Sequence, residues 1–174
     1  AARSRLAAGE TAGVAQHLEA AAERPWTFYG QLAEIQLGRD SGLDFAASEP
    51  SNDEIARFIE RYPAARRAAA LAQLGRLSEV ERELRRLHAD LPREDDRAFL
   101  ALATLLEAPA AQLRAAEYGG PEVAAGFCPA TSFEPDDGFS LDRAMIYAIV
   151  RQESYFNPKA VSVSNARGLM QLLP

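Results

Sequence analysis

The stretch IVRQESYFNP, which begins at Ile149, contains an acidic side chain that could do proton chemistry. The pattern around it predicts an amphipathic helix in which Glu153 shares a face with Ile146 and Val150. On an apolar face near the end of a helix, a charged carboxylate is disfavoured by desolvation and by the negative end of the helix dipole. A carboxylic acid that keeps its proton near neutral pH is what a general acid requires. Glu153 is therefore the candidate catalytic residue.

Residues that favour helix starts and stops set the expected bounds of this helix. Ser140 is the predicted N-cap, and Asn157-Pro158 is a stop signal. Further on, the apolar run GLMQLL, residues 168–173, predicts the start of a second helix.

Upstream, the chain is predicted to form short amphipathic helices separated by glycine and proline breaks, the longest running from Gly38 to Pro50. Helices this short are unstable alone, so consecutive antiparallel pairs must stack, as in an α-solenoid. The fold class is therefore all-α. The predicted helices are Thr11–Glu23, Trp26–Leu37, Ser51–Glu60, Ala64–Leu74, Ser78–His88, Arg93–Glu107 and Ala110–Tyr118.

Three regions follow from these patterns. Residues 1–126 form the α-superhelical region, and residues 127–139 form a connecting loop because FCPATSFEPDDGF lacks helical periodicity. Residues 140–174 form the beginning of a second domain. The first residues resemble the tail of a helix already under way, and Pro174 follows an open apolar run, so we expect a fragment cut from a longer protein.

Composition excludes several functional classes. The net charge is −6 without a long basic run, which disfavours nucleic acid as a partner. Cys128 is the single cysteine, and with His17 and His88 it makes no metal-ligand pattern, so no metal is expected. The sequence contains no apolar run long enough to span a membrane.

The run AIVRQESYFNPKAVSVSNARGLMQLLP, which contains Glu153, closely resembles the opening of the catalytic domain of soluble lytic transglycosylases. The shared pattern is R-Q-E-S, an aromatic residue and N-P, a serine, and then A-x-G-L-M-Q-L-x-P. RPWTFYGQLAEIQLG, from Arg24, resembles the helical superhelix of the same family. The resemblance implies an α-superhelix followed by a lysozyme-like domain, here truncated early in the catalytic domain.

The resemblance also implies a reaction. These enzymes cleave the β-1,4 bond between N-acetylmuramic acid and N-acetylglucosamine in peptidoglycan without water, and leave a 1,6-anhydro ring. Glu153 would act first as acid and then as base, while Ser162, Gly168 and Gln171 would bind the substrate. No cofactor is implied. Downstream of Glu153 the chain has no Asp or Glu, which fits substrate assistance in place of a second carboxylate.

The family further implies a periplasmic location and peptidoglycan glycan strands as the partner; protein partners of the helical region stay open. We expect residues 1–174 alone to be inactive. Two alternatives are a helical-repeat scaffold for protein interactions and a lysozyme-type hydrolase on the same fold. The absence of a strict repeat period and the motif run favour the transglycosylase.

Overall fold

The structure is a computed structural model that describes residues 2–40, 51–129 and 131–174. It divides into two compact units, Ala1–Ala47 and Ser48–Pro174. Both units are helical, and in the described ranges the only β pairing is a set of isolated bridges near the C-terminus. The all-α prediction is confirmed for these ranges. Residues 41–50 of the predicted Gly38 to Pro50 break lie outside the described residues.

The first unit contains three short helices, α1 (Ala2–Ala7), α2 (Val14–Ala22) and α3 (Phe28–Gln36). Thr27 caps α3, because its hydroxyl accepts a hydrogen bond from the Gly30 amide at 3.0 Å. Arg39 forms a forked ion pair with Glu19 of α2, with N–O distances of 2.8 and 2.7 Å. This pair ties α2 to the chain that follows α3.

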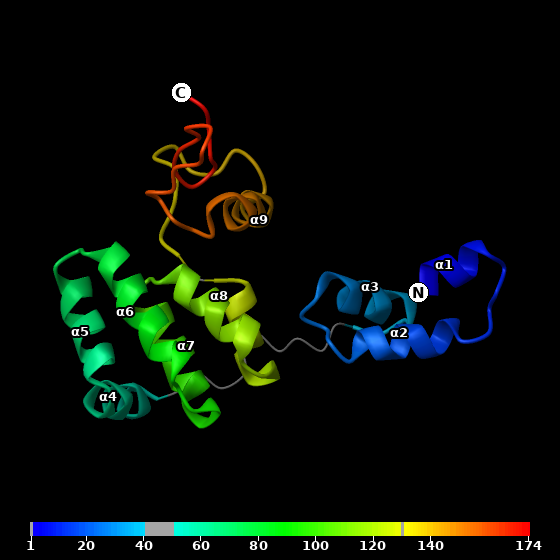
Figure 1. The fold of residues 1–174 in the computed structure, drawn as a ribbon, viewed down its shortest axis with the longest axis horizontal. Coiled ribbons are helices and arrows are strands. Elements are labelled where there is room, and N and C mark those ends of the chain that lie inside the picture. The colour runs from blue at the N-terminus through cyan, green and yellow to red at the C-terminus, as the bar shows by residue number, and fades with distance from the viewer. Residues whose placement is uncertain (1, 41–50, 130) are drawn as a thin grey trace. The chain divides into compact units, whose positions relative to one another are not determined.

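The second unit is built on a stack of five helices. Within it α5 packs on α6, α6 on α8, and α7 on α8 (Figure 1). Short connections between consecutive helices favour this pairing. The helices are α4 (Asn52–Arg61), α5 (Pro63–Gln73), α6 (Leu77–Ala89), α7 (Asp96–Leu105) and α8 (Pro109–Tyr118).

Local sequence signals set where these helices begin. Ser51 and Glu54 form a reciprocal capping box at the start of α4. Pro63 and Pro109 occupy the first turns of α5 and α8, where a missing amide hydrogen is harmless. Most predicted helices are therefore found within a few residues of their expected bounds.

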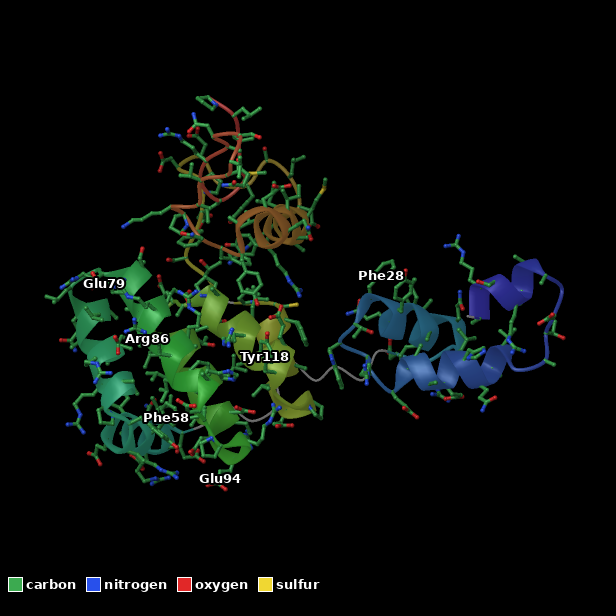
Figure 2. The ribbon with its side chains drawn as sticks, viewed as in Figure 1. Phe28, Phe58, Glu79, Arg86, Glu94 and Tyr118 are labelled. Carbon is green, nitrogen blue, oxygen red and sulfur yellow. The ribbon has the colours of Figure 1, made fainter. Side chains whose placement is uncertain are left out.

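The core of the stack consists of apolar side chains that recur along the helices every three or four residues. Each large one contributes roughly 1.5–3 kcal/mol on burial. Those with almost no exposed surface are Phe58, Val80, Leu84, Phe99 and Leu102, and Phe58 is labelled on α4 in Figure 2.

Two features of the stack differ from the expectation. The predicted helix Arg93–Glu107 is a 3-10 turn, Arg93–Asp95, followed by α7, and Glu107 adopts a left-handed backbone with φ 51° that ends the helix. After α8, a second 3-10 segment, Pro121–Phe127, extends the helical region beyond Tyr118, the end of the last helix predicted there.

The C-terminal part corrects two further expectations. Helix α9 (Arg143–Ser154) is capped by Asp142 and not by Ser140, since the Asp142 carboxylate accepts hydrogen bonds from two first-turn amides at 2.7 and 3.3 Å. Residues 168–173 do not start a helix. Arg167 and Leu172 exchange backbone hydrogen bonds at 2.9 and 3.2 Å across a tight turn, which a helix cannot accommodate.

In the ranges that the structure describes, no helix combines the length and the hydropathy that crossing a membrane requires.

Candidate active site

Helix α9 carries the candidate acid and ends in an abrupt reversal. Tyr155 caps its C-terminus with φ 54°, and Phe156 follows with φ 60°. A left-handed backbone costs a non-glycine residue roughly 1–2 kcal/mol. Burial of Phe156, which is 3 % exposed, offsets that cost. The end of α9 is therefore fixed by packing.

Glu153 is exposed, which corrects the expectation that it shares the packed face of its helix. Val150 is the buried residue of α9. At about 100° per residue, Ser154 lies about 40° from Val150 around the helix and Glu153 about 60° to the other side. Ser154 turns inward, and its hydroxyl donates to the Val150 carbonyl at 3.1 Å. Glu153 thus projects beside the packed face, and the expected desolvation is not present here.

Aromatic contacts hold α9 in place. The Tyr147 hydroxyl donates to the Phe133 carbonyl at 2.7 Å, and its ring meets Phe156 edge-on with centroids 5.8 Å apart. Leu113 of α8 joins this cluster, so the packed face of α9 rests on the helical stack. These contacts fix the orientation of α9, the helix that carries Glu153.

The loop after α9 gathers the other three candidate residues. The Ala160 carbonyl accepts hydrogen bonds from the Gly168 amide at 2.9 Å and from the Gln171 side-chain nitrogen at 3.2 Å. Gln171 also donates to the Gly168 carbonyl at 2.9 Å. The Ser162 hydroxyl accepts from the Ala166 amide at 3.0 Å. The polar groups of these residues therefore fix the loop.

Gly168 has φ +75°, where a residue with a side chain is strained. Gln171 adopts φ 49° within the same turn. The structure thus brings Ser162, Gly168 and Gln171 into one hydrogen-bonded loop. Glu153 belongs to α9 and not to this hydrogen-bonded loop.

A cavity of about 590 Å3 lies between α6, α8 and residues 154–159, which follow Glu153 in sequence. Tyr155 lines it, and burial together with a hydrogen bond from its hydroxyl to Glu117 raises the pKa of Tyr155. Glu81 of α6 also lines it. Burial raises the pKa of Glu81 to about 7, although its carboxylate accepts hydrogen bonds from the Ala110 and Ala111 amides at 3.0 and 2.9 Å.

Residues 131–174 match the family model of the Transglycosylase SLT domain. This match confirms the resemblance to the lytic transglycosylases for that segment. This SLT segment, residues 131–174, contains α9 and the loop that follows it. At the level of the family, the match indicates transglycosylase activity on peptidoglycan.

The sequence pattern gave no sign of the cavity. Its lining comes from α6, from α8 and from the end of α9, which are far apart in the chain. One residue could have indicated the cavity. Glu81 follows the buried Val80 in the chain, and a carboxylate next to a core position needs a hydrogen-bond or ion-pair partner.

Proposed function

We propose that this chain belongs to a lytic transglycosylase that cleaves the β-1,4 bond between N-acetylmuramic acid and N-acetylglucosamine in peptidoglycan. The match of residues 131–174 to the SLT domain carries the proposal. The exposure of Glu153 on the anchored helix α9 supports it, because an acid must be reachable by a polymeric substrate.

In the proposed reaction Glu153, protonated at the start, donates its proton to the glycosidic oxygen. The C1–O bond breaks, and the acetamido group of the muramic acid stabilises the positive charge at C1. The Glu153 carboxylate then takes the proton of the 6-hydroxyl, whose oxygen bonds to C1 and closes the 1,6-anhydro ring. Glu153 ends protonated, and no water is consumed.

Substrate assistance fits the distribution of carboxylates in the SLT segment. A glycosidase with two catalytic carboxylates holds them on either side of the scissile bond. The other acids of the segment are Glu134, Asp136, Asp137 and Asp142, all of which precede α9 or cap its first turn. Glu153 alone stands at the C-terminal end of the helix.

The loop beside α9 is the proposed substrate-binding element. In our proposal Ser162, Gly168 and Gln171 contact the saccharide. Their hydrogen bonds within the loop support a rigid surface, and the absence of a side chain at Gly168 permits close approach of a sugar ring. The enzyme would act in the cell envelope, in the periplasm, and needs no cofactor in this scheme.

We also propose that residues 1–174 alone are inactive. Proton transfer to a leaving oxygen requires the acid to be held against a bound sugar, and a water-excluded site is what keeps a carboxylic acid protonated near neutral pH. Glu153 is exposed in this structure, so it is not enclosed in a site that would hold it against a bound sugar.

Product analysis of purified sacculi tests the proposal. The full-length gene product should release muropeptides with 1,6-anhydro ends, as identified by mass spectrometry. Reducing ends in their place would indicate a lysozyme-type hydrolase. An absence of soluble products, with the protein folded, would favour the helical-repeat scaffold.

A further inference from the structure

The last turn of α9 carries Glu153, and a helix end has few constraints of its own. The final carbonyl groups of a helix have no partner within it, so terminal turns fray. Here the Tyr155 amide closes the turn by donating to the Arg151 carbonyl at 3.1 Å. Tyr155 adopts a left-handed backbone with φ 54°, which is unfavourable for a residue with a side chain. The position of the last turn therefore depends on what holds Tyr155.

Tyr155 is held by α8. Its ring packs in the cluster that contains Leu113 and Phe156. Its hydroxyl forms a hydrogen bond with the carboxylate of Glu117, on the last turn of α8 beside Tyr118, which is labelled in Figure 2. Burial and this bond raise the pKa of Tyr155, so the hydroxyl keeps its proton near neutral pH and is the donor. The helical stack thus contacts the C-cap of α9 through an apolar and a polar group.

A second hydrogen bond of the same kind joins the stack to the SLT segment elsewhere. The Ser132 hydroxyl donates to the Glu107 carboxylate at 2.5 Å. Both bonds join a hydroxyl of the segment to a carboxylate of the stack. Ser132 precedes α9 in the chain, whereas Tyr155 caps the end of α9 that carries Glu153. The bond of Ser132 is therefore a matched control for the bond of Tyr155.

We propose that Glu117 is a positioning residue for the candidate acid: through the Tyr155 hydroxyl it holds the last turn of α9, and with it Glu153. The role of Glu153 as the acid rests on the proposed function, whereas the contact does not. Glu153 is exposed, so its place follows that of the turn that carries it. A general acid must lie within hydrogen-bond reach of the leaving oxygen, and a displacement of about 1 Å can slow a reaction about 100-fold. The stack would thus contribute to the rate without touching the substrate.

Kinetics of the full-length gene product test this, with soluble uncrosslinked peptidoglycan strands as substrate and release of 1,6-anhydromuropeptides measured by mass spectrometry. Tyr155→Phe keeps the ring and removes the hydroxyl. It should lower kcat about tenfold and change KM by less than about threefold. Glu117→Ala should do the same, and the double variant should be no worse than either single variant, because the two groups act together.

Two further variants separate positioning from a general loss of contacts. Glu117→Gln keeps an oxygen that accepts the hydrogen bond, so its kcat should stay within about threefold of the wild type. Ser132→Ala removes the control bond and should change kcat by less than about twofold. Circular dichroism melting verifies that all variants fold.

Hydrogen–deuterium exchange of residues 1–174 gives a readout that needs no activity. In the peptide that covers the last turn of α9, exchange should become at least about fivefold faster in Tyr155→Phe and Glu117→Ala, and should not change in Ser132→Ala. This result would support the contact even if the wild type released no anhydro products, which would overturn the proposed function alone. Unchanged exchange in Tyr155→Phe, a kcat of that variant within about twofold of the wild type, or an equal loss in Ser132→Ala would each overturn the positioning role.

Discussion

Glu81 joins α6 to the first turn of α8, and its replacement by glutamine gives a quantitative test of how the stack is held. The carboxylate accepts the amide hydrogens of Ala110 and Ala111, which have no partner inside their own helix. Burial raises its pKa from 4.5 to about 7 in spite of these bonds. The charged form is thus the costly one in the folded state.

The sign of the pH effect follows from linkage. Between about pH 4.5 and 7 the folded state holds a proton at Glu81 that the unfolded state has lost, so stability falls as pH rises through this window. The rise of the pKa from 4.5 to about 7 corresponds to about 3.4 kcal/mol at 25 °C. Above pH 7 the loss is complete. In Glu81→Gln, whose neutral amide oxygen still accepts a hydrogen bond, this dependence should vanish.

Urea unfolding followed by far-ultraviolet circular dichroism at pH 5, 6, 7 and 8 measures the effect. Circular dichroism is used because Trp26, the only tryptophan in the sequence, belongs to the first unit, whereas Glu81 belongs to the second. The difference in free energy of unfolding between wild type and Glu81→Gln cancels the other titrating groups. We expect the free energy of unfolding of Glu81→Gln, relative to that of the wild type, to rise by about 1–3 kcal/mol between pH 5 and pH 8.

The control is Glu60→Gln, an exposed acid on α4, which should change stability by no more than about 0.5 kcal/mol at every pH. If the stability of the wild type relative to Glu81→Gln instead increases as pH rises, the start of α8 stabilises the carboxylate as an anion. The reasoning from burial would then be wrong.

Two further predictions concern the C-terminal part. Phe156→Ala should destabilise the second unit by about 3–5 kcal/mol, because it removes the buried ring between α8 and α9. Urea unfolding followed by circular dichroism measures this loss. A loss below about 1 kcal/mol would contradict the packing. Gly168→Ala should lower the free energy of unfolding by about 1 kcal/mol, because Gly168 has a φ of +75°. Proteolysis of the loop after α9 should also become faster. Unchanged cleavage rates would show that the turn tolerates a side chain.

Local signals predicted the helical stack well. Ser51 with Glu54, and prolines at the first turns of α5 and α8, act over a few residues, so a sequence pattern detects them. The match of residues 131–174 confirms the resemblance that the R-Q-E-S and G-L-M-Q motifs carried. The division of the chain at 126 and 139, and the roles of the site residues, stay predictions.

Tertiary packing decided what the pattern could not. Periodicity alone placed Glu153 with Val150, but Val150 is buried and Ser154 is half-buried, while Glu153, on the other side of Val150 around the helix, is exposed. The apolar run at 168–173 has helical character, yet the backbone pairing of Arg167 with Leu172 prevails. The cavity depends on contacts between α6, α8 and α9, which no local window contains.

The most direct test of the central claim is the product spectrum of Glu153→Gln in the full-length gene product, incubated with purified sacculi and analysed by mass spectrometry. Because Glu153 is exposed, the substitution should leave the melting temperature within a few degrees. The account predicts 1,6-anhydromuropeptides from the wild type and none above background from the variant. Release of these products by the folded variant at more than a few per cent of the wild-type rate would show that another group is the acid.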